Sequence, residues 1–137
     1  EHSGHYYFRD NYRADSGIIA AMAVLEVMCA SGQKLSELRK PFERYASSGE
    51  LNTEVPDPLA VIEFVAERFA SAGQDRLDGL TIDLTEGAAA DPDDPWWFNL
   101  RPSNTEPLLR LNLEASDEAA CARHVAEIRA LIAEAAG

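Results

Sequence analysis

Hydrophobic and polar positions alternate along much of the second half of the chain. Apolar residues recur at every second position in the segments 80–84, 96–100 and 108–114. That spacing is typical of strands with one buried face. A shorter alternation at Leu51, Thr53 and Val55 predicts another strand. Together these segments predict a mainly antiparallel sheet with one face against a core.

Helical spacing of apolar residues separates these strands. Asp15 or Ser16 is expected to cap a helix that runs to about Cys29 and ends at Ser31-Gly32. A short helix is expected near 36–40. Asp57-Pro58 opens a further helix, and acidic residues in the first turn favour another from Ser116. The expected buried face of the first helix is Ile18, Met22, Leu25 and Met28 or Cys29. That of the helix after Asp57-Pro58 is Leu59, Ile62, Val65, Ala66 and Phe69. That of the last helix is Cys121, Val125, Ile128 and Ile132.

The order strand, helix, three strands, helix predicts an α+β fold of two layers, with helices covering one face of the sheet. The small polar residues Ser47-Ser48-Gly49 suggest a linker over residues 45–49. We therefore expect two parts, 1–48 and 49–137, of which the first is mostly helical.

Charge differs between these two parts. The net charge is −12, and residues 1–48 hold six acidic and six basic groups, against eighteen acidic and six basic in residues 49–137. So acidic a second part argues against binding to nucleic acid or an anionic membrane, because both require a basic surface. The longest apolar stretch, 18–30, is short and contains Glu26, so we expect no membrane span, no signal peptide and a cytoplasmic protein.

Several residues that invite a chemical role are better explained without one. Cys29 and Cys121 are expected to be reduced core residues, and His124 a surface residue of the last helix. Asp91, Asp93 and Asp94 lack the ordered spacing and distal glutamate of a calcium loop. We therefore predict a solvated acidic loop and no metal site in this chain.

The segment 101–107, Arg-Pro-Ser-Asn-Thr-Glu-Pro, gathers oxyanion donors at the expected tip of a hairpin. The planar guanidinium of Arg101 can donate to two phosphate oxygens at once. The side chains of Ser103, Asn104 and Thr105 can donate to the remaining oxygens. The same residue types are common in ordinary turns, so a plain turn is the alternative. Glu106 would have to point away from a bound anion.

The start of the chain carries a second polar group of residues, Glu-His-Ser-Gly-His at 1–5. A carboxylate, a hydroxyl and an imidazole suit a polyol, because sugar hydroxyls both donate and accept hydrogen bonds. The alternative is a mobile terminus with a chance pair of histidines.

Together the two segments resemble the alpha-D-phosphohexomutases, the family of phosphomannomutase and phosphoglucomutase. The family's sugar loop, Gly-Glu-x-Ser-Gly-His, is matched at 1–5 except for its leading glycine, and its phosphate loop, Arg-x-Ser-Asn-Thr-x-Pro, is matched at 101–107. The resemblance covers essentially the whole chain. It implies the end of the family's third domain, which is α/β, followed by a fourth domain with a TATA-binding-protein-like fold.

The resemblance also implies an activity and roles for named residues. Such enzymes interconvert hexose 1-phosphate and hexose 6-phosphate through a hexose 1,6-bisphosphate. Sugar hydroxyls would be bound by Glu1, Ser3 and His5, with His5 also able to assist proton movement. The phosphate that is not being transferred would be bound by Arg101, Ser103, Asn104 and Thr105.

The reactive serine and the aspartate-rich magnesium loop of the family are not found in this sequence. The resemblance therefore implies that Mg²⁺ and the transfer chemistry belong to N-terminal domains of the same enzyme, and that this fragment alone is inactive. The alternative is a non-catalytic phosphosugar-binding or interaction module.

Two finer expectations follow from the resemblance. The family's last domain closes over sugar about a hinge, which would fall at 47–49 here. His2 and Asn104 favour mannose or glucose phosphates over glucosamine phosphate, without choosing between the first two.

Overall fold

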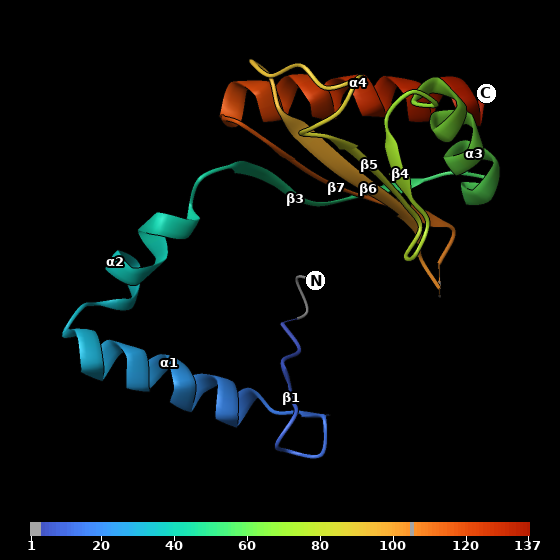
Figure 1. Ribbon diagram of the computed structural model, residues 1–137. Coiled ribbons are helices and arrows are strands. Elements are labelled where there is room, and N and C mark those ends of the chain that lie inside the picture. The colour runs from blue at the N-terminus through green and yellow to red at the C-terminus, as the bar shows by residue number, and fades with distance from the viewer. Residues whose placement is uncertain (1–3, 105) are drawn as a thin grey trace. The chain divides into compact units, whose positions relative to one another are not determined.

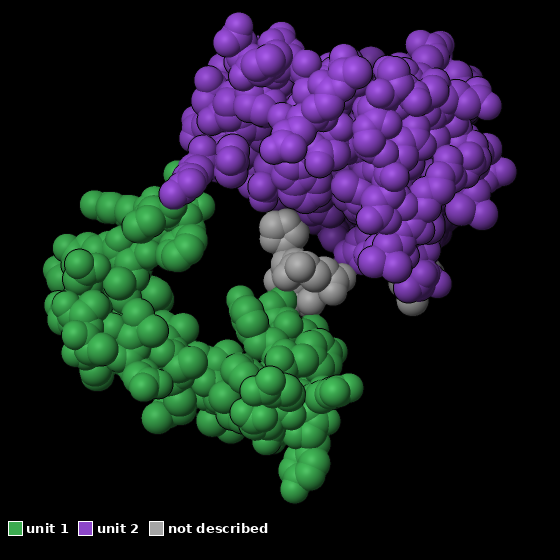
Figure 2. Space-filling model, in the orientation of Figure 1, with its two compact units in different colours: residues 1–43 green, residues 44–137 purple. Residues whose placement is uncertain are grey.

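The computed structural model describes residues 4–104 and 106–137. The chain divides into two compact units, 1–43 and 44–137 (Figure 2). Unit 1 contains β1 (Tyr7–Phe8), β2 (Ala14–Asp15), α1 (Gly17–Ser31), α2 (Leu35–Arg39) and the 3-10 helix η1 (Lys40–Phe42). Unit 2 contains β3 (Ala46–Glu54), α3 (Pro58–Arg68), β4 (Gly73–Asp75), β5 (Leu80–Leu84), β6 (Trp96–Pro102), β7 (Leu108–Ala115) and α4 (Glu118–Ala136).

The five strands of unit 2 form one antiparallel sheet in the order β3-β7-β6-β5-β4. Helices α3 and α4 cover one face of this sheet (Figure 1). The α+β fold with helices on one face is therefore confirmed. The short edge strand β4 was not predicted, because Gly73–Asp75 has no apolar alternation.

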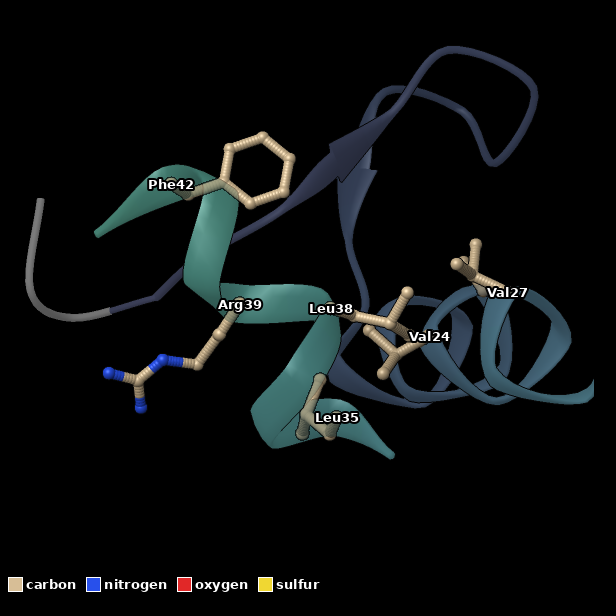
Figure 3. A pocket seen from close by; sticks show the side chains of 7 residues that line it. Val24, Val27, Leu35, Leu38, Arg39 and Phe42 are labelled. Carbon is tan, nitrogen blue, oxygen red and sulfur yellow. The ribbon is translucent and has the colours of Figure 1, made fainter. Parts of the chain in front are cut away.

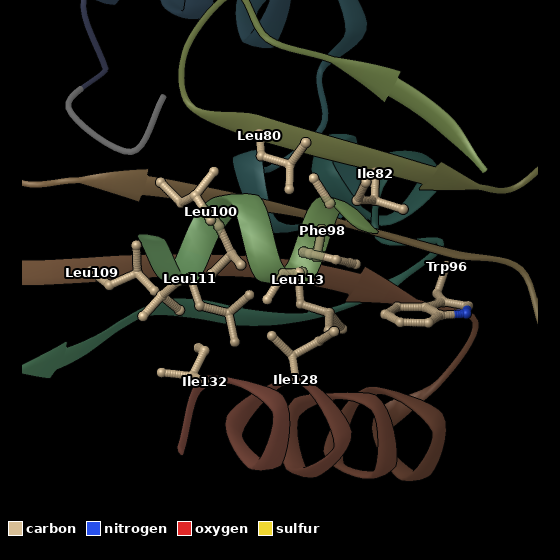
Figure 4. Close-up of a cluster of buried hydrophobic side chains, with 14 of the residues drawn as sticks. Leu80, Ile82, Trp96, Phe98, Leu100, Leu109, Leu111, Leu113, Ile128 and Ile132 are labelled. Carbon is tan, nitrogen blue, oxygen red and sulfur yellow. The ribbon is translucent and has the colours of Figure 1, made fainter. Parts of the chain in front are cut away.

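The alternating apolar positions form the core between sheet and helices (Figure 4). Phe98 has no exposed surface and lies with its ring centroid 5.5 Å from Trp96 and 5.2 Å from Phe69. Other fully buried members are Leu80, Ile82, Leu100, Leu109, Leu111, Leu113, Ile128 and Ile132. Because side chains alternate along a strand, the residues between these positions occupy the opposite face of the sheet. That face is polar.

The predicted linker is wrong, because Ser47, Ser48 and Gly49 lie within β3. Strand β3 pairs with β7 but shifts register between Ser47 and Glu50, which makes a β-bulge opposite Leu113. Gly49 has φ +62°, which suits glycine. The Leu113 N–H donates to Ser48 Oγ at 3.0 Å. The bulge therefore explains the small polar residues. The two compact units of the structure divide between Glu43 and Arg44.

Helix α1 begins and ends as predicted but buries none of its residues within its unit. Ser16 Oγ accepts from the Ile19 N–H, and Gly32 ends the helix with φ +66°. Cys29 is exposed, so its expected core position is wrong, whereas Cys121 is buried and burial raises the pKa of its thiol. In α3, Leu59 is likewise exposed instead of buried. The helical spacing of apolar residues predicted the apolar faces of these helices. It did not predict whether another part of the structure covers each residue.

Within residues 4–104 and 106–137, no individual helix has the length and apolar character needed to cross a membrane. One bent pair, Gly17–Ser31 with Leu35–Phe42, meets that criterion by length and composition alone.

His124 is buried, which corrects its predicted surface position. Its ring stacks on Trp96 at 3.9 Å between centroids, and its Nε2 lies 2.9 Å from Asp94 Oδ2. Arg123 donates to the same carboxylate oxygen at 2.6 Å. The acidic loop before β6 is thus attached to α4 through Asp94, while Asp93 is exposed.

This attachment should make stability depend on acid pH. The Arg123 guanidinium, with a smaller contribution from His124, holds the pKa of Asp94 below its usual value. A carboxyl group whose pKa is lower in the folded than in the unfolded state stabilises the fold at pH values above its unfolded-state pKa, about 4. This stabilisation is lost as the pH falls through the folded-state pKa. The difference in unfolding free energy between the unsubstituted chain and Asp94→Asn should therefore be largest near neutrality.

Urea unfolding at several pH values would measure this difference. It should shrink as pH falls below about 4, and Asp93→Asn should show no such trend. An Asp94→Asn difference that stays constant with pH would contradict the explanation.

Candidate functional site

Arg101 lies near the end of β6 on the polar face of the sheet. Its Nη2 donates to Glu50 Oε2 on β3 at 3.3 Å, and its Nη1 lies 3.8 Å from Asp78 Oδ2. Its side chain is only 20% exposed. Two carboxylates from distant parts of the chain therefore hold this guanidinium at the surface of the sheet.

Arg110 is the residue directly opposite Arg101 across the β6–β7 ladder. Its Nη1 lies 3.3 Å from Glu50 Oε1, so the two oxygens of Glu50 each face a different guanidinium. Its Nη2 donates to Ser103 Oγ at 3.4 Å. Its Nε is buried and has no hydrogen-bond partner among the residues that the structure describes. We call Glu50, Asp78, Arg101, Ser103 and Arg110 the arginine cluster.

The turn between β6 and β7 brings the predicted donor segment to this cluster. The Ser103 N–H donates to the Leu108 carbonyl at 2.8 Å, which closes the turn. Asn104 and Glu106 are exposed. Thr105 lies outside the described residues. Two of the predicted phosphate-binding residues, Arg101 and Ser103, therefore share one cluster, in which Glu50 and Arg110 connect them.

Gly79 supports the cluster from the bend that precedes β5. It has φ +74°, and a Cβ added there would lie 2.3 Å from the Leu100 carbonyl oxygen and 2.8 Å from Arg101 Cα. The backbone before β5 therefore approaches Arg101 so closely that only glycine fits.

His5 belongs to unit 1, where Asp15 positions it. Its Nδ1 lies 2.6 Å from Asp15 Oδ2, and the Tyr6 N–H donates to Asp15 Oδ1 at 3.0 Å. The His5 hydrogen bond is the main cause that lowers the pKa of Asp15. Gly4 has φ +66°, which explains a glycine before His5. Glu1 and Ser3, together with His2, lie outside the described residues.

Sequence reasoning missed Glu50, Asp78, Arg110 and Asp15. Arg110 was visible in principle, because the alternation of 108–114 places it on the polar face with Arg101. Glu50 could not be placed, since its face depends on the bulge at Gly49. Asp15 was considered only as a helix cap.

The described residues do not make a magnesium site. Among residues 4–104 and 106–137, no group of three or more His, Cys, Asp and Glu side chains is arranged to hold a metal ion. Asp94 in the acidic loop is already engaged by Arg123 and His124.

A hollow of about 310 Å³ in unit 1 lies between α1, α2 and η1 (Figure 3). It is lined by Ala23, Val24, Val27, Leu35, Leu38, Arg39 and Phe42. Arg39 is paired with Glu43. The apolar lining of this hollow suits packing against other apolar side chains more than recognition of a phosphosugar, which needs several polar partners.

Comparison with known proteins gives two family matches that together cover most of the chain. Residues 50–131 match the phosphoglucomutase/phosphomannomutase C-terminal domain, and residues 1–45 match alpha/beta/alpha domain III of the same enzymes.

Individual relatives agree with these matches. A phosphomannomutase of Methanocaldococcus jannaschii is 42% identical over 98% of this chain and 28% of its own length. A phosphomannomutase of Escherichia coli is 35% identical over 96% of this chain and 28% of its own length. A crystal structure of a phosphoglucomutase/phosphomannomutase family protein from Burkholderia thailandensis matches 97% of this chain and 27% of its own, with a TM-score of 0.70 and 28% identity.

The chain spans less than a third of the length of these relatives. Within that span, the family matches and the solved structure both cover nearly all residues of this chain. The chain belongs to the phosphoglucomutase/phosphomannomutase family, of which it carries the C-terminal domain preceded by a segment that matches domain III.

Proposed function

We propose that this chain is the substrate-binding part of a longer phosphohexomutase that interconverts hexose 1-phosphate and hexose 6-phosphate through a bisphosphorylated sugar. The observation that carries the proposal is the arginine cluster, which places two guanidinium groups side by side on the polar face of the sheet. The relatives described above are phosphomannomutases, which supports the same substrate class.

In this proposal Arg101 grips the phosphate that is not being transferred. A guanidinium has five N–H donors in a planar fork, a geometry that matches two oxygens of a phosphate at once. Ser103, Asn104 and Thr105 add shorter donors from the turn. The low exposure of Arg101 strengthens its attraction for an anion, because nearby solvent screens the charges less.

Unit 1 supplies the sugar-binding part in this proposal, as the end of the family's third domain, and unit 2 is the fourth domain. Glu1, Ser3 and His5 bind ring hydroxyls, with Asp15 holding the His5 ring so that Nε2 is directed away from the carboxylate. The exposed apolar residues of α1 would pack against the rest of that domain, since an apolar helix requires a covering surface.

Anchoring one phosphate accelerates reaction at the other end of the sugar. Binding energy at the non-reacting phosphate places the reacting oxygen near the group that exchanges phosphate, which is a proximity effect. In this proposal the metal and the phosphoryl exchange belong to other domains of the longer enzyme, because this chain spans less than a third of its relatives' length.

The activity test uses the complete gene product that contains this chain. It is incubated with mannose 1-phosphate, magnesium and a catalytic amount of glucose 1,6-bisphosphate. We expect it to produce mannose 6-phosphate, which phosphorus NMR detects. The 137-residue chain alone should produce none. If the complete protein binds the phosphosugar but does not convert it, a non-catalytic binding module would be favoured.

A further inference from the structure

Glu50 stands out because it is the acidic residue placed between the two guanidinium groups of the arginine cluster. Oε2 faces Arg101 Nη2 at 3.3 Å, and Oε1 faces Arg110 Nη1 at 3.3 Å. The side chain is 26% exposed. It comes from β3, which neighbours β7 but not β6, so it reaches across β7 to Arg101.

We propose that Glu50 is a positioning residue for anion binding, which holds Arg101 and Arg110 side by side in the orientation that a phosphate requires. This inference rests on the proposed function, because it concerns the same anion site.

The first argument is electrostatic. Arg101 and Arg110 are directly opposed across two paired strands, and like charges in that position repel each other. Without a carboxylate between them, this repulsion would favour separation of the two guanidinium groups. Glu50 contacts one nitrogen of each guanidinium, so the entropy cost of ordering these side chains is met before the anion arrives.

The second argument is that the fold builds this position with a specific device. Glu50 is the first residue after the bulge at Ser48 and Gly49, and the bulge sets it on the polar face opposite Asn112. The Leu113 N–H, opposite the bulge, is satisfied by Ser48 Oγ. The extra residue in β3 therefore places the Glu50 carboxylate on the face that carries both arginines.

The third argument excludes an incidental surface ion pair. Isolated exposed pairs contribute little, because two flexible side chains must be fixed for a weak, screened attraction. Here all three side chains are at most 30% exposed, and one carboxylate serves two guanidinium groups. Fixing one side chain thus serves two interactions.

The opposite role makes the opposite prediction. If Glu50 acted only as a negative charge near the site, it would repel phosphate, and its neutralisation would tighten binding. If it positions the arginines, its neutralisation weakens binding although the repulsion is relieved. The sign of the effect therefore decides between the two.

The experiment titrates the 137-residue chain with inorganic phosphate by isothermal calorimetry. Glu50→Gln should weaken binding by about tenfold, the equivalent of one lost charge-assisted hydrogen bond. Glu50→Asp keeps the charge but is one methylene shorter and cannot reach both guanidinium groups, so it should weaken binding similarly. Glu54→Gln, an exposed carboxylate on the same strand, is the matched control and should leave the affinity unchanged.

A second readout requires no ligand. Nitrogen NMR of the arginine side chains should show hindered rotation of the Arg101 and Arg110 guanidinium groups in the unsubstituted chain and in Glu54→Gln. It should show faster rotation of both groups in Glu50→Gln and Glu50→Asp, while backbone amide signals of the sheet confirm that each variant is folded.

Equal or tighter phosphate binding by Glu50→Gln would overturn the positioning role and leave the anion site intact. Binding by Glu50→Asp that equals the unsubstituted chain would also overturn it, since charge alone would then suffice. If the unsubstituted chain binds no phosphate, the proposed anion site itself is wrong, and the role of Glu50 falls with it.

Discussion

Replacing Arg101 by alanine should weaken binding of mannose 1-phosphate to this chain by on the order of 100-fold, the loss expected for two hydrogen bonds to a charged group. Arg101 is the predicted anchor and a member of the arginine cluster, with its guanidinium held by Glu50. Removing it also leaves the Glu50 carboxylate with one partner fewer, which adds repulsion toward the phosphate. Calorimetric titration would measure the change.

Two further variants separate the anchor from general charge. Arg101→Lys keeps the charge but loses the planar fork, so most of the affinity should still be lost. Arg76→Ala removes an exposed arginine that pairs with Glu63, and should change binding little. Equal effects of Arg76→Ala and Arg101→Ala would mean that net charge, and not the cluster, attracts the phosphate.

Replacing Gly79 by alanine should lower the free energy of unfolding by about 3 kcal/mol or more. Its left-handed backbone costs about 1–2 kcal/mol for a residue with Cβ, and crowding a packed site costs about 1–3 kcal/mol. The added methyl group would meet the Leu100 carbonyl oxygen at 2.3 Å and Arg101 Cβ at 2.7 Å. Because β6 must shift to relieve this contact, phosphate binding at Arg101 should weaken as well.

Gly87→Ala is the matched control for this substitution. Gly87 also has a positive φ, +101°, but a Cβ there would meet nothing within 4 Å. It should therefore carry only the backbone cost of about 1–2 kcal/mol and leave phosphate binding unchanged. Denaturant unfolding of both variants gives the comparison, and equal destabilisation would show that the approach of Gly79 to Arg101 is unimportant.

The core of unit 2 was predictable because its signal is local. Strict alternation in β5, β6 and β7 places Ile82, Phe98 and Leu111 on one face whatever the rest of the chain does. The bulge in β3 was not predictable in this way. Ser47, Ser48 and Gly49 suit a linker and a bulge equally well, and only pairing with β7 decides between them.

Burial that depends on distant partners was also hidden. His124 has charged neighbours in sequence, yet it is buried by stacking on Trp96, which comes from strand β6. Conversely, α1 has an apolar sequence and no buried residue, since unit 1 offers little to cover it. For the candidate site, composition identified Arg101 and Ser103, while Glu50 became evident only through the register of β3.

The measurement that tests the central claim most directly is an amide NMR titration of this chain with mannose 1-phosphate, compared with mannose. The account predicts phosphate-dependent shifts at Arg101, Ser103 and Asn104, and at Glu50 and Arg110 across the sheet, with no such shifts from mannose. Absence of shifts at these residues, or equal shifts from mannose, would contradict the claim that the arginine cluster binds the phosphate of a phosphosugar.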